Sequence, residues 1–213
     1  MSPEVSPQQF RAADGVADWR LLFDGANVFY RTQSMADGAA LAGTVGALDG
    51  MADVEAAVDL RADGVTVRLA WYSGLTQQHI SLAQQVSVAA HAAGAVADVS
   101  RVQVVQIAVD AVSKPAVMEF WRVVLGYRQR GEEDLFDDRG RGPQLWFQDM
   151  DQPRPQRNRI HVDLSLPHRE AEARMQAALA AGGTLVRDHA PQWWTLADPE
   201  GNEVDIAAHT DLG

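Results

Sequence analysis

A pattern of strand, helix and short strands occurs twice in the second half of the sequence, and this duplication constrains the fold more than any other feature. In the first copy, the strand VQVVQIAVDA precedes the helix KPAVMEFWRVVLG, and short strands follow as far as Gln148. In the second copy, the strand NRIHVDLSL precedes the helix HREAEARMQAALAAGG, and three further strands follow. The repeat therefore predicts two copies of a βαβββ unit.

The first half of the sequence has a different pattern. Helical periodicity covers residues 35–52 and 76–95, and runs of alternating apolar and polar residues lie before and between them. Asp63-Gly64 is expected to form a tight hairpin turn, since both residue types tolerate positive φ. With a short N-terminal helix, the expected order is α-β-β-α-β-β-α, an antiparallel sheet with helices on one face.

The change of pattern indicates two domains of an α+β protein. The boundary is expected near Asp98 to Arg101, which gives domains at 1–98 and 99–213. A chain of 213 residues with 46% hydrophobic residues has enough apolar material for a packed core in each.

Composition excludes several classes of function. Acidic residues outnumber basic ones by 29 to 18, and a net charge of −11 would repel nucleic acid. The chain has no cysteine, so any metal must be held by imidazole, carboxylate or amide groups. No uninterrupted apolar run reaches the roughly 18 residues that a membrane span needs. We therefore expect a cytoplasmic protein with no nucleic-acid or membrane partner.

Several segments of the first domain resemble those of one enzyme family. They are Trp19 and the segments VFYRTQSMADGAALAGTVGAL, VDLRADGVTVRL and GLTQQHISLA. In these segments the domain is similar to pterin-4a-carbinolamine dehydratase, over nearly the whole length of that fold. The family removes water from a carbinolamine with a His-His-Pro triplet before the hairpin and a further histidine after it. Imidazole groups suit this proton transfer because their pKa lies near neutrality.

The catalytic positions of that family carry other residues here. The triplet falls on Val54, Glu55 and Ala56, so both of its imidazoles are missing. Glu55 could act alone as a general base, but an exposed carboxylate without a catalytic role is the favoured interpretation. The other family positions fall on Ala62, on Trp71 or Tyr72, and on His79. We expect His79 and His91 at surface or interface positions, and a dehydratase scaffold that has lost its chemistry.

The second domain resembles a different superfamily. The segments FWRVVLGY, RIHVDLS and WWTLADPEGNEVDI are similar to those of the vicinal oxygen chelate superfamily, in its glyoxalase-like and bleomycin-resistance-like branch. The resemblance extends from Val102 to about His209. It implies that the two βαβββ halves form a cup around a small-molecule pocket. Within the last segment, Asp198 to Asn202 is expected to form a tight turn that sets the register of the final strand.

Metal sites of that superfamily take one ligand from the first and one from the last strand of each half. These positions fall on Gln106, on Gln148 or Trp146, on His161 and on Asp205. His161 and Asp205 are good ligands and the candidate catalytic residues, whereas Gln106 offers only a weakly binding amide oxygen. One divalent ion, Zn, Mn, Fe or Ni, would suit this set. In the alternative, no metal is bound, His161 and Asp205 hydrogen-bond across the cup, and the glutamines line the pocket.

Tryptophans are concentrated in the second domain. Trp146 and Trp194 are candidates for an aromatic pocket wall that would suit a planar or apolar ligand, although core packing explains such residues as well. Alternation along the strand directs Trp193 and Trp194 to opposite faces, so at most one of that pair faces the cup. The charged segment from Glu132 to Gly142 is expected to be a solvated hairpin, or a lid.

Three functions follow. The first is a small-molecule lyase, isomerase or dioxygenase with its site in the second domain and His161 and Asp205 at the centre. The second is a metal-free protein that binds or sequesters a small molecule. The third is residual carbinolamine dehydration in the first domain. A homo-oligomer is expected, since the dehydratase family assembles through its sheet and helices.

Overall fold

The computed structural model divides the chain into two units, Met1–Val104 and Val105–Gly213. It describes residues 4–69, 74–154, 156, 158 and 160–209. The boundary expected near Asp98 to Arg101 falls within the last residues of the first unit. Among the described residues, no helix has both the length and the apolar character that crossing a membrane requires.

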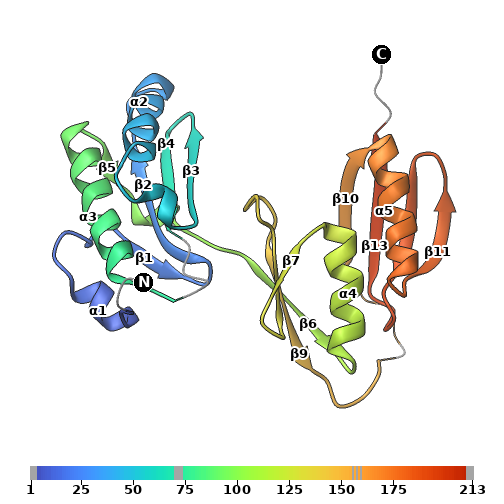
Figure 1. Ribbon diagram of the computed structural model, residues 1–213. Coiled ribbons are helices and arrows are strands. Elements are labelled where there is room, and N and C mark those ends of the chain that lie inside the picture. Colours follow the sequence, from blue (N-terminus) through green and yellow to red (C-terminus); the bar gives the residue numbers. More distant parts are fainter. Residues whose placement is uncertain (1–3, 70–73, 155, 157, 159, 210–213) are drawn as a thin grey trace. The chain divides into compact units, whose positions relative to one another are not determined.

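The first unit follows the expected order of helices and strands (Figure 1). Its strands pair in the order β1-β2-β4-β3, with β5 also paired to β2. The elements are α1 (Pro7–Ala12), β1 (Arg20–Leu22), β2 (Gly25–Arg31), α2 (Met35–Gly46), the 3-10 helix η1 (Met51–Asp53), β3 (Ala56–Arg61), β4 (Gly64–Leu69), α3 (Gln77–Ala92), β5 (Val96–Ala97) and the 3-10 helix η2 (Val99–Arg101).

One face of this sheet packs against α2 and α3. Val65 and Val67 alternate with polar residues along β4, and both belong, with Val28 of β2, to a core shared with Leu41 of α2 and Val86 of α3. The α-β-β-α-β-β-α arrangement is therefore present. The expected helix over 35–52 ends earlier, at Gly46, because Gly50 adopts a left-handed conformation with a φ of 83° and starts a separate 3-10 turn.

The predicted hairpin is present, but its turn lies one residue earlier than expected. Arg61 and Gly64 pair as the last residues of the ladder, so Ala62 and Asp63 form the turn. Gly64 does not have a positive φ. A glycine is needed there for a different reason, because a Cβ at Gly64 would lie 2.3 Å from the carbonyl oxygen of Tyr30.

The second unit contains the two predicted βαβββ modules, each with its own four-stranded sheet. In each module the first and last strands are parallel neighbours, and the other pairs are antiparallel. The first module comprises β6 (Gln106–Ala111), α4 (Lys114–Leu125), β7 (Arg128–Arg130), β8 (Asp134–Phe136) and β9 (Gln144–Asp149). The second comprises β10 (Val162–Pro167), α5 (His168–Ala180), β11 (Thr184–His189), β12 (Trp193–Ala197) and β13 (Glu203–His209).

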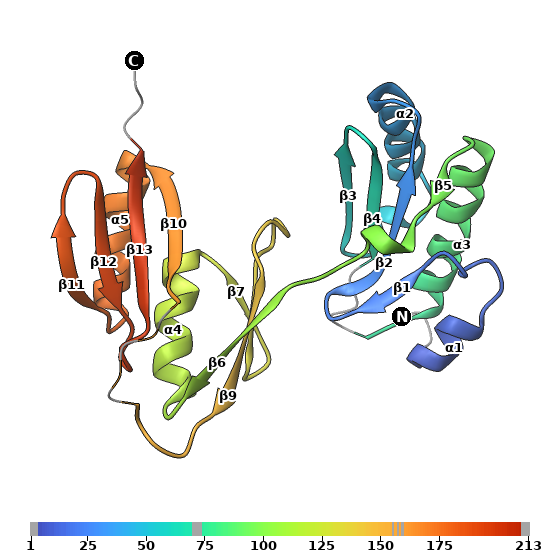
Figure 2. The same ribbon diagram turned by 180° about the vertical axis from the view of Figure 1, so that it is seen from behind.

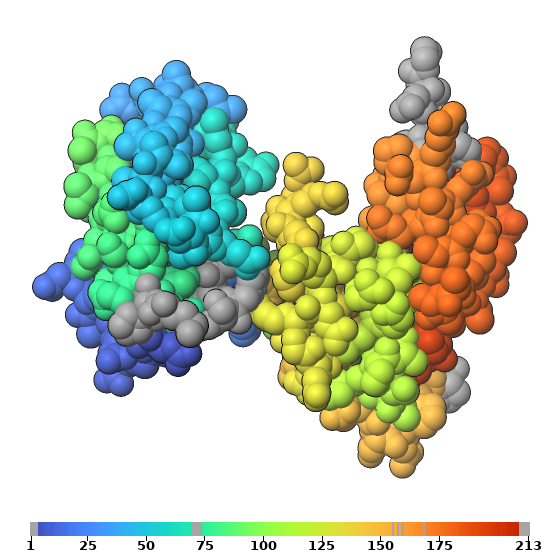
Figure 3. Space-filling view, in the orientation of Figure 1, coloured from blue at the N-terminus to red at the C-terminus, as the bar shows by residue number. Residues whose placement is uncertain are grey.

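The two modules share one hydrophobic core. Phe120 and Trp121 of α4 pack in the same cluster as Ala178 of α5 and Ile206 of β13, and the surfaces of α4 and α5 meet in Figure 3. Figure 1 shows α5 in front of its sheet, and Figure 2 shows that sheet from the side that the helix leaves uncovered. Polar residues of β10, β12 and β13 lie on this uncovered face.

Candidate functional site

The uncovered face of the second module carries a row of polar side chains. Asp163 on β10 lies opposite Asp205 on β13 in the parallel pair, and Asp205 lies opposite Thr195 on β12 in the antiparallel pair. Side chains alternate along each strand, so Val204 and Ile206 point into the core while Asp205 points away from it. Three neighbouring strands thus place two carboxylates and a hydroxyl side by side.

His161, which immediately precedes β10, completes this group. Its Nε2 lies 3.2 Å from Oδ1 of Asp163 and 3.6 Å from Oδ2 of Asp205. One ligand atom from each of the three residues lies within 4.8 Å of the others. The side chain of Asp205 is the least exposed, at 25%, compared with 40% for His161 and 72% for Asp163. We call His161, Asp163 and Asp205 the acidic triad.

The acidic triad fits a divalent cation by its chemistry and by one unsatisfied atom. Like charges directly opposite each other on neighbouring strands are destabilising, and Asp163 and Asp205 are such a pair. Among the described residues, the buried Oδ1 of Asp205 has no hydrogen-bond partner. A cation held by one imidazole nitrogen and two carboxylates would relieve the repulsion between the two carboxylates, and this donor set suits Zn, Mn, Fe or Ni.

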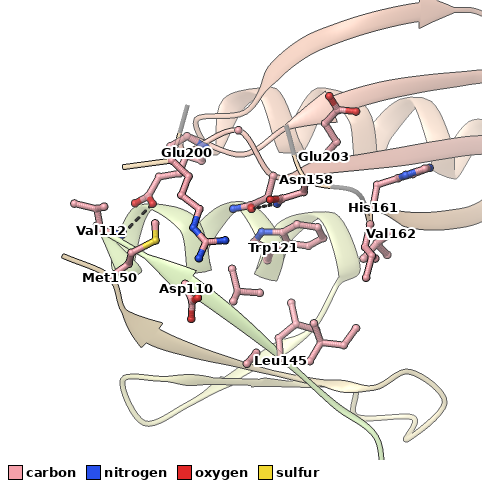
Figure 4. A pocket seen from close by; sticks show the side chains of 18 of the residues that line it. Asp110, Val112, Trp121, Leu145, Met150, Asn158, His161, Val162, Glu200 and Glu203 are labelled. Carbon is pink, nitrogen blue, oxygen red and sulfur yellow. Dashed lines mark hydrogen bonds between the residues drawn. The ribbon is translucent and has the colours of Figure 1, made fainter. Parts of the chain in front are cut away.

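A cavity of about 750 Å³ adjoins the acidic triad. It lies between the edge strands of the two modules, with Ile107 to Asp110 of β6 on one side and Ile160 to Val162 on the other. Figure 4 shows Trp121 near its centre, with Val112 and Met150 towards one end and His161 towards the other. His161 belongs to both features, so a molecule in the cavity would reach the triad through this residue.

The expected tight turn from Asp198 to Asn202 is present and borders the cavity. Oδ1 of Asp198 accepts hydrogen bonds of 2.9 Å from the backbone N–H groups of Glu200 and Asn202. Glu200 then accepts from the backbone N–H groups of Val112 and Ser113, at 2.9 and 2.6 Å. The turn of the second module thereby fixes the start of α4 in the first module.

The other predicted ligand positions lie on the sheet of the first module. Gln106 and Gln148 belong to β6 and β9, and the Nε2 of Gln148 donates a short hydrogen bond to Asp110. Trp146, on the same face, donates through Nε1 to Glu133 at 3.4 Å. Of the four predicted ligand positions, the structure brings His161 and Asp205 together, whereas Gln106 and Gln148 lie on the other sheet.

The two adjacent tryptophans of β12 face opposite ways, as alternation predicts. Trp194 is 4% exposed and lies in the shared core, away from the face of Asp205. Trp193 is 38% exposed, and its ring stacks on His189 with centroids 4.3 Å apart. Trp194, expected to line the pocket, therefore occupies a packing position, and Trp193 is the one on the uncovered face.

Sequence reasoning missed two residues of the site. Asp163 lies two residues after His161, and strand alternation alone could have placed it on the same face. Trp121 was counted among the tryptophans of the second domain but was not chosen as a pocket residue, because no local pattern indicated that its ring would lie at a cavity between modules.

The dehydratase-like positions of the first unit do not assemble an acid and base pair in the described residues. Val54 and Glu55 lie between η1 and β3, Ala56 begins β3, and Glu55 is exposed. His79, expected at a surface or interface, is instead 4% exposed, and its Nδ1 accepts a 3.2 Å hydrogen bond from the backbone N–H of Thr76 at the start of α3. Trp71 and Tyr72 lie outside the described residues.

Comparison with protein families identifies the second unit. Residues 106–207 match the family described as glyoxalase-like domain, so the C-terminal half of the chain carries such a domain. None of the curated proteins compared with the chain matches it.

Solved structures resemble the chain over about half of its length. A glyoxalase-related enzyme from Fulvimarina pelagi is 22% identical with a TM-score of 0.41, covering 50% of this chain and 88% of that one. A glyoxalase/bleomycin resistance protein/dioxygenase family enzyme from Burkholderia phytofirmans is 17% identical with a TM-score of 0.39, covering 48% and 95%. A possible glyoxalase from Bacillus cereus is 16% identical with a TM-score of 0.39, covering 50% and 98%.

Proposed function

We propose that the glyoxalase-like half of this chain is a small-molecule enzyme of the lyase, isomerase or dioxygenase type, with a divalent ion held by the acidic triad. The carrying observation is that His161, Asp163 and Asp205 place one ligand atom each within 4.8 Å of the others. The unpartnered, buried Oδ1 of Asp205 supports the same assignment.

Each residue of the acidic triad would have its own role. When bound, a divalent ion polarises oxygen atoms of a substrate. Asp205 and Asp163 supply negative charge from neighbouring strands, and His161 presents Nε2 between them. The adjoining cavity removes much of a substrate from water, and its contact with His161 directs one end of the substrate towards the triad.

Metal stoichiometry tests this proposal. Elemental analysis of untagged protein, purified without chelator, should find about one divalent ion per chain, as expected for a dedicated metal site. His161→Ala and Asp205→Asn should lose the ion. His91→Ala is the matched control, because His91 also pairs with an aspartate, Asp18, at 3.0 Å but lies in the first unit. Absence of metal in the wild type, even after loading with Zn, Mn, Fe or Ni, would overturn the metal assignment.

A metal-free binding protein is the second candidate. The observation that favours it is the cavity itself, because a largely apolar cavity can hold a ligand without any ion. This function would stand if small molecules bind to the chain while the metal measurement is negative.

For the first unit, we propose a dehydratase-like scaffold without dehydratase activity, which would assemble copies of the chain into a homo-oligomer. The order of its elements supports the resemblance, and the lack of imidazoles at Val54, Glu55 and Ala56 supports the loss of activity. The purified chain should not accelerate dehydration of a pterin carbinolamine, and it should sediment as more than one chain. Turnover that is sensitive to Glu55→Gln would contradict the first statement.

A further inference from the structure

The cavity beside the acidic triad has walls of a particular chemistry. Aliphatic and thioether side chains from β6, β9 and the connection between the modules face it. Its volume of about 750 Å³ lies in the range of cavities that hold drug-sized molecules. The apolar lining includes Ile107, Val109, Leu145, Met150 and Ile160.

The orientation of Trp121 determines what a ligand would meet at the centre of the cavity. Its Nε1 donates a 2.9 Å hydrogen bond to the buried carboxylate of Asp198, so the only donor of the indole is already used. Trp121 is only 3% exposed and belongs to the core that the two modules share, so a ligand would meet a small part of its ring and not its N–H group (Figure 4).

Exposed aliphatic side chains gather around the same cavity. Ile107, Val112 and Ile160 are 36%, 47% and 84% exposed, and all three belong to the lining. Large apolar side chains exposed together on one part of a surface are typical of binding sites. An apolar ligand would cover these side chains and remove them from water.

Charged residues of both signs line the cavity. Among the described lining residues, Asp110, Glu200 and Glu203 are acidic and Arg154 is the one arginine or lysine. Glu200 is occupied by the backbone N–H groups of Val112 and Ser113, and Glu203 accepts a 3.3 Å hydrogen bond from Arg187. Asp110, which is exposed and accepts from Gln148, leaves negative charge facing the cavity. Arg154 brings a positive charge to the same lining, so the described residues favour neither sign of ligand charge.

We infer that the cavity between β6 and β10 binds a largely apolar molecule, which covers Ile107, Val112 and Ile160 and has its polar end at His161. The inference rests on the proposed function in one respect, which is that the reaction takes place at the end of the cavity where His161 lies. Binding of the apolar body depends on the cavity and not on a metal.

A neutral, apolar fluorescent probe, N-phenyl-1-naphthylamine, tests the inference. Fluorescence titration of the full chain should show one site for this probe, because the cavity offers one apolar lining. Binding at several weak sites would overturn the inference.

Two surface variants locate the site. Ile160→Glu changes an 84% exposed side chain of the lining, and Val88→Glu changes a 69% exposed side chain on α3 of the first unit. Both positions are exposed enough for the chain to fold. We expect Ile160→Glu to weaken binding of the neutral probe by about tenfold or more, since it places a charge against apolar rings, and Val88→Glu to leave binding unchanged. No binding to the wild type, or equal binding to both variants, would overturn the inference.

The titrations are repeated after chelation and after metal loading, which separates this inference from the proposed function. If the wild-type chain takes up no metal but binds the probe, and Ile160→Glu loses this binding, the metal assignment is overturned and the cavity assignment is supported. If the chain binds one metal ion but not the probe, the cavity assignment is overturned and the metal assignment is supported.

Discussion

The indole Nε1 of Trp121 donates a buried 2.9 Å hydrogen bond to Oδ2 of Asp198, and this bond joins the two βαβββ modules. Asp198 is 2% exposed, and its carboxylate also accepts from the Nδ2 of Asn202 at 2.7 Å. Its other oxygen accepts from two backbone N–H groups of the turn that it begins. A single side chain thus holds both the turn before β13 and the ring at the centre of the cavity.

Replacement of this carboxylate should destabilise the second unit strongly. Asp198→Ala leaves the Trp121 Nε1–H and the N–H groups of Glu200 and Asn202 without their acceptors, and we expect a loss of about 3 kcal/mol or more. Urea unfolding followed by tryptophan fluorescence measures it. Asp151→Ala, at an exposed aspartate of the same unit, is the control and should stay within about 0.5 kcal/mol of the wild type. A similar midpoint for both variants would contradict the role given to Asp198.

Removal of the Glu200 carboxylate should weaken the start of α4. Its two oxygens accept from the N–H groups of Val112 and Ser113, and its charge lies near the positive end of the helix dipole. We expect Glu200→Ala to cost about 1 kcal/mol and Glu200→Gln, which keeps one acceptor oxygen, to cost less. Hydrogen exchange of the first turn of α4 should rise in the same order. Unchanged exchange in both variants would show that the contact adds no stability.

Two glycine substitutions should have opposite effects. Gly64→Ala would bring a Cβ within 2.3 Å of the Tyr30 carbonyl oxygen and 2.6 Å of the Phe29 ring, and we expect a loss of about 2–3 kcal/mol. Gly43→Ala lies in α2 with nothing within 4 Å of its added Cβ, and should stabilise the chain by up to about 1 kcal/mol through helix propensity. Thermal unfolding measures whether each variant raises or lowers the unfolding midpoint. Equal shifts would contradict the close packing at Gly64.

Tyr127 should make stability depend on alkaline pH. Burial, with a smaller contribution from the charge of Asp137, raises the pKa of Tyr127 from 10.0 to about 12. Because the folded chain favours the neutral phenol, this contribution to stability is complete below pH 10 and is lost as the pH rises from 10 to about 12. Tyr127→Phe cannot ionise, so its unfolding midpoint should fall less over this range than that of the wild type. Parallel curves for the two proteins would contradict the prediction.

The sequence predicted the repeated module because its signals are local. The apolar period of KPAVMEFWRVVLG depends only on residues within one element, and α4 forms where this segment lies. The turn at Asp198 could be predicted for the same reason, since its acceptor oxygens and N–H donors are at most four residues apart.

The candidate site contains only some of the predicted ligand positions. His161 and Asp205 do approach each other, but Gln106 and Gln148 lie on the sheet of the first module, and Asp163 takes the third place in the acidic triad. The family resemblance indicated at which strand positions ligands would lie. Which side chains are neighbours in space depends on the pairing of strands that are far apart in the sequence.

For this protein, the sequence by itself determined which segments become strands and helices, that Trp193 and Trp194 face opposite ways, and that any metal ligand must be nitrogen or oxygen. The tertiary structure decided that Trp194 is the buried one, because α5 covers its side of the sheet. It also decided that Trp121 lies at a cavity, because β6, the connection before β10 and the turn at residues 199–203 line that cavity together although the sequence separates them. Alternation and composition are local properties of the chain, while burial and cavities arise from the packing of elements that the sequence separates.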